Sequence, residues 1–278
     1  MRAPLRRGAA IDNSRRDDWL DRFRFYRHPP NRAAINAWLQ RFTDDDRDIA
    51  ARVLDCVEVV SEIQIHEGYR RALKALPGWH TNKQERDGNW YFVGFGDAGE
   101  SGQSMVRIFR EANNLTSEKY NYLFCNLIDL PKKKATAADT IVFIDDFSGT
   151  GKQVCRKWPI VFELVASDAQ FFLVLTAATE PAINKIESET MLSVRAKIRI
   201  QRNENIFSPS CQRFTAAERE TLLSYCERAD SQQPKGYGDC GLLYVLSHKT
   251  PNNSIPILHV NKSRWRGLFP RYLQDAEE

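Results

Sequence analysis

The chain of 278 residues lacks the patterns that mark several classes of protein. Its six cysteines include no Cys-x-x-Cys pair and no histidine at metal-ligand spacing beside them. We therefore expect neither a structural zinc site nor a disulfide framework. No apolar run approaches the ~18 residues of a membrane span, and the first residues contain no apolar core of a secretory signal. The expected protein is reduced, soluble and cytoplasmic, with no membrane contact.

The charge is small overall but unevenly placed. The formal net charge is +4, and residues 1–32 alone contain nine arginines and four aspartates. An arginine-rich start can contact nucleic acid or an acidic partner protein. A solvated leader and helix face would have the same composition, so both interpretations stay open. With 42% hydrophobic and 11% aromatic residues, the chain can bury a globular core.

One stretch, Thr140–Gln153, combines an apolar run, two carboxylates and a turn of small residues. The run Ile141–Ile144 is typical of a central parallel strand. Asp145 and Asp146 follow at its carboxyl end, where open α/β sheets bind ligands. The turn then precedes a predicted helix, and its backbone N–H groups can hold a phosphate. The turn residues are Ser148, Gly149, Thr150, Gly151, Lys152 and Gln153.

This stretch is not a nucleotide-binding P-loop. A Walker A loop requires a glycine five residues before its final Gly-Lys pair, and a Ser or Thr directly after that pair. Asp146 occupies the first of these positions and Gln153 the second. The sequence therefore excludes a P-loop at this position.

A second glycine-rich turn lies earlier in the chain. Residues 90–95, WYFVGF, predict a strand, and residues 105–112 carry the apolar face of a helix. A strand, a glycine-rich turn and a helix again make an anion-binding corner. The turn residues are Gly96, Asp97, Ala98, Gly99, Glu100, Ser101 and Gly102.

Together the two turns resemble the type I phosphoribosyltransferases, in which a strand, an acidic pair and a turn of Thr, Gly and Ser residues bind phosphoribosyl pyrophosphate (PRPP). The resemblance implies that Asp145 and Asp146 are the catalytic pair and hold the ribose 2′- and 3′-hydroxyls. It also implies that residues 148–153 wrap the 5′-phosphate and that residues 96–102 form the pyrophosphate loop. The chain departs from the family where Lys152 and Gln153 replace the usual Gly-Thr.

Charge in the first turn bears on magnesium. Asp97 and Glu100 stand where the family often has a basic residue, so they would repel bare pyrophosphate. One explanation is that magnesium lies between the loop and pyrophosphate. We expect that ion to be held by the bound molecule and assign no residue that coordinates it directly. The other explanation is that the loop no longer binds pyrophosphate. By chain order Lys132, Lys133 and Lys134 correspond to the flexible loop with which the family places a cation over the leaving pyrophosphate. A solvated surface loop is the alternative.

The C-terminal part extends the resemblance. Residues 241–259, with the two turn segments, resemble the phosphoribosyltransferase-like effectors of bacterial conflict systems, including retron-type anti-phage operons. The resemblance covers about residues 85–272 and implies a role in antiviral defence. His248, Asn252 and Asn253 could contact a base or a ribose. Hydrogen bonds that stabilise their own turn are an equally supported alternative.

The order of the predicted elements favours an α/β domain over residues 81–278, with a parallel sheet flanked by helices and right-handed crossovers. Residues 1–80 are expected to form a helical extension that could dock a partner. In it we expect two short helices, broken at residues 28–30, and a long helix from Thr43 towards Gly68 or Pro77. Later strands are predicted at 122–128, 171–175, 195–200 and 241–248, with extended chain at 255–259. Later helices are predicted from Lys152, kinked or restarted at Pro159, and at 182–192 and 215–228, the last beginning with a Thr215–Glu218 capping box.

Two functions remain in view from the sequence. The first is a phosphoribosyltransferase-like protein that binds PRPP or a related ribose 5-phosphate and transfers the phosphoribosyl group to a base, a nucleotide or a macromolecule. The second is a non-catalytic module that senses PRPP or a nucleotide and docks a partner protein. A nucleic-acid-binding adaptor is a third interpretation, supported only by the arginine-rich start.

Overall fold

A computed structural model describes residues 11–96, 101–165, 168–262 and 265–271. The chain divides into two compact units. The inserted unit is the continuous segment Ile63–Ile200, and the terminal unit combines Met1–Glu62 with Gln201–Glu278. The sequence predicts a single boundary near residue 80 instead. The division differs because the N-terminal helices share one hydrophobic core with C-terminal residues, which the inserted unit separates from them in the chain.

The inserted unit is built on a sheet of four parallel strands. In spatial order they are β2 (Trp90–Gly94), β3 (Thr140–Ser148), β4 (Gln170–Thr179) and β5 (Ser193–Ile200). Apolar and aromatic side chains fill β2 and most of β3 and β4, as strands covered on both faces require. The predicted strands at 90–95, 141–144, 171–175 and 195–200 are therefore confirmed. β3 is longer than predicted, because Asp145, Phe147 and Ser148 also pair with β4.

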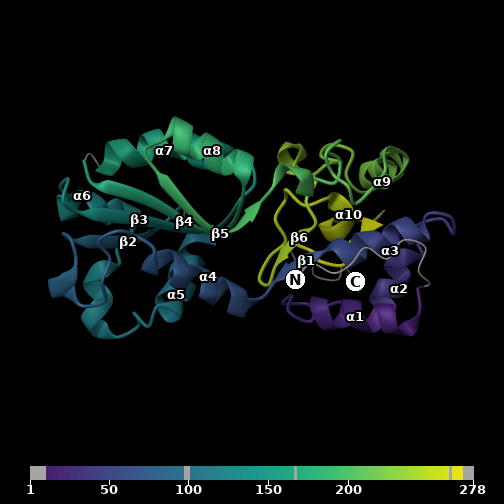
Figure 1. Ribbon diagram of the computed structural model, residues 1–278, viewed down its shortest axis with the longest axis horizontal. Helices are drawn as coiled ribbons and strands as arrows, with labels where there is room; N and C mark the ends of the chain where they lie inside the picture. Colours follow the sequence, from purple (N-terminus) through teal and green to yellow (C-terminus); the bar gives the residue numbers. More distant parts are fainter. Residues whose placement is uncertain (1–10, 97–100, 166–167, 263–264, 272–278) are drawn as a thin grey trace. The chain divides into compact units, whose positions relative to one another are not determined.

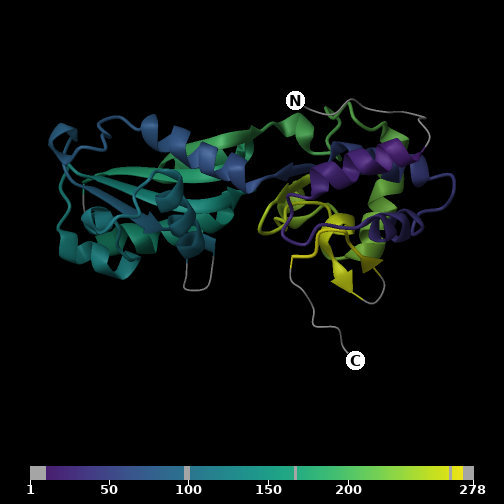
Figure 2. The same cartoon turned by 90° about the horizontal axis from the view of Figure 1, so that it is seen from below.

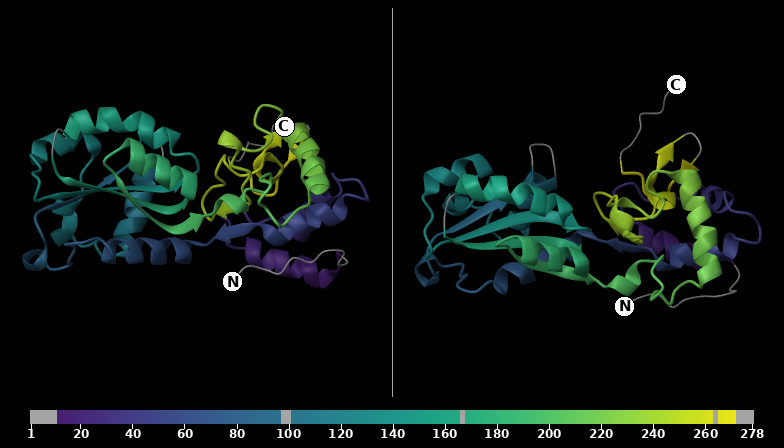
Figure 3. Two further views of the ribbon diagram at one scale, coloured as in Figure 1. Left: turned by 45° about the horizontal axis from the view of Figure 1, so that its top comes forward. Right: turned by 90° about the horizontal axis from the view of Figure 1, so that it is seen from above.

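Helices cover both faces of this sheet. α4 (Glu62–Lys74) and α5 (Ser101–Ala112) lie on one face, in front of the strands in Figure 2. α7 (Lys152–Val165) and α8 (Glu180–Glu189) lie on the other (Figures 1 and 3). Alternate residues of the strands point to opposite faces of the sheet. Phe143 packs with Trp158 of α7 on one face, and Phe92 packs with Phe109 of α5 on the other. The prediction of a parallel sheet flanked by helices is confirmed.

The order in which the chain adds strands across the sheet reverses between β2 and β3. After α5, short 3₁₀ turns lead to Phe124, which forms a parallel bridge with Phe92 on the outer side of β2. The chain then returns through α6 (Leu130–Lys133) to β3, on the other side of β2. The connection through α5 runs from β2 to Phe124, and the connection through α7 runs from β3 to β4, in the opposite direction across the sheet. Because α5 and α7 also lie on opposite faces, the two connections have the same hand. The carboxyl ends of β2 and β3 therefore flank a topological switch point, where open α/β sheets bind ligands.

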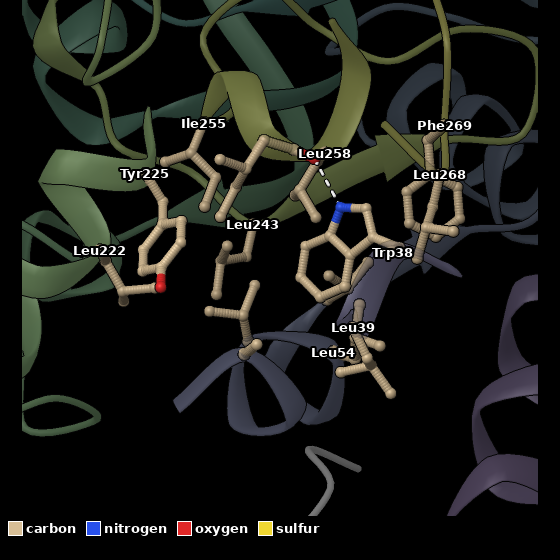
Figure 4. Packing of buried hydrophobic residues seen from close by; sticks show 14 of the residues in the cluster. Trp38, Leu39, Leu54, Leu222, Tyr225, Leu243, Ile255, Leu258, Leu268 and Phe269 are labelled. Atoms are coloured by element: carbon tan, nitrogen blue, oxygen red, sulfur yellow. Dashed lines mark hydrogen bonds between the residues drawn. The ribbon is translucent and has the colours of Figure 1, made fainter. Parts of the chain in front are cut away.

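The terminal unit is mainly helical. Its elements are α1 (Asn13–Phe23), α2 (Arg32–Leu39), α3 (Arg47–Cys56), β1 (Glu58–Val60), α9 (Ala216–Ala229), β6 (Tyr244–Leu246), α10 (Pro256–His259), β7 (Asn261–Lys262) and β8 (Trp265–Arg266). β1 pairs in parallel with β6. Figure 4 shows the core, where the Trp38 indole donates a 2.8 Å hydrogen bond to the carbonyl of Ile257. This bond joins the N-terminal and C-terminal segments directly.

Several sequence predictions are wrong in this structure. The long helix from Thr43 is interrupted, because the backbone of Val57 is extended and β1 pairs with a strand far away in the chain. The strand at 122–128 is reduced to the single bridge of Phe124. The expected strand at 241–248 is only β6, and the extended stretch at 255–259 contains α10.

Other predictions are confirmed. The two short helices are α1 and α2, and the helix from Lys152 is α7. α7 does not restart at Pro159, which lies inside one helix that runs to Val165. Thr215 and Glu218 form the capping box that begins α9. Among the residues that the structure describes, none of the helices has both the length and the apolar character that crossing a membrane requires.

Candidate functional site

The two predicted carboxylates meet the start of α5 at the end of β3. The Ser101 hydroxyl oxygen lies 2.6 Å from Oδ1 of Asp145 and 3.1 Å from Oδ1 of Asp146. The backbone N–H of Asp146 also donates to Oδ1 of Asp145, at 2.9 Å. Asp146 is buried, at 9% exposed, and Asp145 is half-buried. The structure thus brings one residue of the first turn together with the acidic pair of the second.

The surroundings of this pair disfavour its negative charge. Burial and the neighbouring Asp146 charge raise the pKa of Asp145 well above its usual range, against the hydrogen bonds from Ser101 and the Asp146 amide. A hydroxyl carries one proton, yet Ser101 lies within hydrogen-bond distance of two carboxyl oxygens. A proton on one carboxyl would supply the second donor. Two neighbouring carboxylates can accept hydrogen bonds from a ligand with two adjacent hydroxyls.

Tyr69 of α4 supports the same position from below the sheet. Its hydroxyl donates a 2.8 Å hydrogen bond to the backbone carbonyl of Asp145, and its ring packs edge-on against Phe109 of α5. Burial raises the pKa of the Tyr69 hydroxyl, which therefore remains a neutral donor. Sequence reasoning missed this residue, because an aromatic residue on an apolar helix face normally indicates only core packing.

The turn after β3 is fixed by α8. The Thr179 hydroxyl donates to the carbonyl of Gly149 at 2.7 Å and accepts from the N–H of Ala182, capping α8. Sequence reasoning did not single out Thr179, although a Thr before Glu-Pro is a helix-start signal. Gly151 has φ +70°, and a Cβ there would lie 2.9 Å from the carbonyl oxygen of Ala182. Only glycine fits this position without strain.

The start of α7 lies next to this turn. Thr150 Oγ1 accepts a 3.3 Å hydrogen bond from the N–H of Lys152, the first residue of the helix. Ser148 is buried, whereas Lys152 and Gln153 are exposed. The predicted phosphate turn therefore lies at a helix N-terminus, directly after the strand that carries the carboxylates.

The predicted pyrophosphate loop is described only in part. Gly96, Ser101 and Gly102 lie within the described residues, and Asp97, Ala98, Gly99 and Glu100 lie outside them. A Cβ on Gly102 would lie 2.3 Å from the carbonyl oxygen of Phe95, so α5 begins in close contact with the chain that leaves β2. This close approach is what places Ser101 beside the carboxylates.

The lysines of the predicted flexible loop have other contacts. Lys132 Nζ lies 2.8 Å from Oδ1 of Asp129, and Lys133 Nζ lies 5.7 Å from the centre of the Tyr91 ring. Lys134 follows α6 in a left-handed conformation, with φ 48°. The segment also contains α6 itself, anchored by the buried Leu130.

The register of the sheet shows how far Lys133 is from the acidic pair. Its contact Tyr91 pairs with Ile141, four residues before Asp145 on the same strand. At about 3.3 Å per residue, that is ~13 Å along the sheet. The structure therefore does not bring Lys133 to the carboxylates.

His248, Asn252 and Asn253 belong to the terminal unit. Asn253 is 5% exposed, and its side-chain amide donates to the carbonyl of Tyr237 at 2.9 Å. The carbonyl of Asn252 accepts from the N–H of Tyr237 at 2.8 Å. Both bonds hold the turn, and the side-chain bond favours a turn-stabilising role for Asn253. His248 lies in the tight turn between Leu246 and Lys249.

N-terminal arginines serve the terminal unit itself. Arg15 is 1% exposed and contacts the Asp55 carboxylate through Nε and Nη2, at 3.3 and 2.7 Å. Arg22 donates to the carbonyls of Leu54, Asp55 and Val57. These contacts favour a structural explanation of those two arginines over binding to nucleic acid or to an acidic partner.

Comparison with protein-family models gives a match over most of the chain. The model of the PRTase-CE family matches residues 35–271, which include both turns and most of the terminal unit. The match begins earlier than the resemblance found in the sequence, which started near residue 85. No curated protein and no solved structure matches the chain.

Proposed function

Because the chain belongs to the PRTase-CE family, we propose that its acidic pair binds PRPP and that the protein transfers the phosphoribosyl group to an acceptor. A phosphoribosyltransferase-like function follows from the family; the ligand, the site and the type I fold are the proposal. The observation that carries it is the position of Asp145 and Asp146, beside the start of α5 and just before the turn to α7, at the topological switch point.

Asp145 and Asp146 would accept hydrogen bonds from the ribose 2′- and 3′-hydroxyls. Support comes from Ser101, whose hydroxyl already lies within hydrogen-bond distance of both carboxylates. The turn of residues 149–153 would hold the 5′-phosphate through backbone N–H groups and the α7 N-terminus. Thr179 supports this role by fixing the turn through Gly149.

The proposed reaction breaks the bond between C1 of the ribose and the pyrophosphate oxygen. A nitrogen or oxygen of the acceptor forms the new bond to C1 and loses a proton. Positive charge develops at C1 in the transition state, so the site would act through positioning and through nearby negative charge. Asp145 and Asp146 would supply both, since they fix the ring to which C1 belongs.

Magnesium would enter this site with the ligand. Within the described ranges, no group of three or more His, Cys, Asp or Glu side chains could hold a metal ion. The donor chemistry fits magnesium that coordinates pyrophosphate oxygens and water, since this ion is commonly bound through substrate phosphates. When bound, it would neutralise the leaving pyrophosphate.

We further propose that this activity serves antiviral defence, with a base, a nucleotide or a macromolecule as the acceptor. The support is the resemblance of the two turns and the C-terminal segment to conflict-system effectors. Partner contacts through the arginine-rich start have weaker support, because Arg15 and Arg22 bind within the terminal unit. Phage plating would test the role by comparing cells that express the wild-type protein with cells that express Asp145→Asn/Asp146→Asn. Equal protection by the two proteins would contradict it.

A second candidate is a non-catalytic PRPP or nucleotide sensor that docks a partner. Lys132 and Lys133 favour it, because their contacts with Asp129 and Tyr91 leave the pyrophosphate without a loop cation from these residues. A sensor needs binding but not turnover.

The test is calorimetric titration of PRPP with magnesium, together with a pyrophosphate-release assay over a panel of bases and nucleotides. Binding with release supports the transferase, and binding without release supports the sensor. Absence of binding contradicts both. The double variant Asp145→Asn/Asp146→Asn should lose binding and keep its circular dichroism spectrum. The exposed carboxylates Glu163 and Asp168 provide the control, since Glu163→Gln/Asp168→Asn should bind normally.

A further inference from the structure

Ser101 bridges the two carboxylates although it belongs to a different element. It is the first residue of α5, and its hydroxyl oxygen lies 2.6 and 3.1 Å from the Oδ1 atoms of Asp145 and Asp146 on β3. A ligand hydroxyl that bound both oxygens would need nearly the same position. The Ser101 hydroxyl and such a ligand hydroxyl therefore cannot occupy the site together.

A ribose offers the acidic pair more hydroxyls than Ser101 does. Ser101 offers one proton to two carboxylates, whereas the 2′- and 3′-hydroxyls of a ribose offer two. The ribose hydroxyl that contacted both Oδ1 atoms would take the place of the Ser101 hydroxyl. A 2-deoxyribose would offer one hydroxyl at this position, as Ser101 does.

We propose that Ser101 is an internal substitute for a ligand hydroxyl, which holds the carboxylate pair in the ligand-free protein and must be displaced when a ribose 5-phosphate ligand binds. This inference rests on the proposed ribose site and adds to it a residue that sets the affinity. Ser101 is then a competitor of the ligand and not one of its contacts.

The packing around Ser101 limits how it can leave. Gly102 approaches Phe95 so closely that even a Cβ would collide with its carbonyl oxygen, and a Cβ on Gly94 would lie 2.8 Å from the Gly102 carbonyl carbon. Movement of the helix start would have to break these contacts. Rotation of the Ser101 side chain about χ1 needs no such movement and is fast. Displacement should therefore appear as an equilibrium factor in the affinity.

The test compares Ser101→Ala with Ser104→Ala, an exposed serine on the same helix. Calorimetry would measure the affinities for PRPP with magnesium, ribose 5-phosphate and 2-deoxyribose 5-phosphate. Ser101→Ala should bind each ligand roughly five-fold more tightly, the effect of removing one competing hydrogen bond. The ratio of the ribose and deoxyribose affinities should not change, because the ligand-free state is common to both. Ser104→Ala should match the wild type.

A residue that only supports the structure would behave differently. Ser101→Ala should lower the melting temperature of the ligand-free protein while it tightens binding, and these opposite signs are specific to competition. Ser101→Thr, which keeps the hydroxyl, should retain wild-type affinity. Equal or weaker binding by a folded Ser101→Ala variant would overturn the inference, as would a changed affinity ratio, while wild-type binding would still support the proposed function. If neither protein bound any of the three ligands, the proposed function would fail; binding by Ser101→Ala alone would support both.

Discussion

The Tyr69 hydroxyl donates a 2.8 Å hydrogen bond to the backbone carbonyl of Asp145, on the residue whose carboxylate is the centre of the proposed site. Tyr69 is fully buried, and its ring packs edge-on against Phe109. α4 is thereby bonded to the end of β3 and packed against α5. The backbone that carries the acidic pair is thus held from one face of the sheet, independently of any ligand.

Tyr69→Phe should lower the free energy of unfolding by about 1–2 kcal/mol, because it removes one buried hydrogen bond and leaves a carbonyl without that donor. PRPP affinity should fall as well, since the backbone at Asp145 loses its support. Chemical denaturation and calorimetry would measure the two effects. Tyr91→Phe makes the same change on the opposite face of the sheet and should leave the affinity unchanged. Wild-type stability in Tyr69→Phe would contradict the assigned bond.

Asp145→Asn should stabilise the ligand-free protein at pH 8. Burial and the Asp146 charge raise the pKa of Asp145, so the folded protein holds its proton more tightly than the unfolded chain. Stability is therefore lost as pH rises from about 4, the unfolded value, through the raised pKa. The variant lacks this loss and should gain on the order of 1 kcal/mol or more at pH 8. Melting curves from pH 4 to 8 would test this, with the exposed Asp168→Asn as the control. A difference that did not grow with pH would count against it.

Asp139, before β3, should show the opposite dependence. Burial alone would raise its pKa, but hydrogen bonds from Thr136 and Asn89 outweigh burial and lower it. Its contribution to stability is therefore present above pH ~4 and lost as pH falls through the lowered pKa. Asp139→Asn should lose about 2–4 kcal/mol at pH 7, because an amide cannot accept all four of these bonds. The deficit should shrink in acid, and a deficit that stayed constant from pH 7 to 3 would refute the assignment.

Gly151→Ala should weaken both stability and ligand binding. The added Cβ would lie 2.9 Å from the carbonyl oxygen of Ala182, at a φ of +70° that alanine rarely adopts. The expected loss is ~1–3 kcal/mol of unfolding free energy and a displaced phosphate turn. Gly78→Ala is the matched control, since Gly78 also has positive φ but contacts the side chain of Asp87. That variant should lose stability and keep its PRPP affinity.

The sequence predicts the elements whose signals are local. The apolar runs of β2 and β3 and the capping box of Thr215 and Glu218 depend on neighbouring residues, and they appear where expected. The two turns could be proposed from the sequence for the same reason, because strand, turn and helix signals follow one another in the chain. Whether their residues bind PRPP is a prediction that the mutations above would test.

Features set by distant pairing could not be read from the sequence. β1 interrupts the expected long helix because Val59 pairs with Val245, and the intervening chain gives no sign of that partner. The terminal unit could not be predicted for the same reason. Its core joins residues such as Trp38 and Ile257, which the inserted unit separates in the chain. Tyr69 was missed because its hydrogen bond to Asp145 depends on how α4 packs under the sheet.

The insertion of one unit into the other has a consequence for synthesis on the ribosome. Residues 63–200 are continuous and can fold as soon as they emerge, whereas residues 1–62 must wait for their partners from residue 201 onwards. At ~5–20 residues per second, translation of the roughly 140 intervening residues takes on the order of 10 s. During that interval Trp19, Phe23 and Trp38, all buried in the finished protein, lack most of their core. The nascent N-terminal helices are therefore the part of this chain most in need of a chaperone.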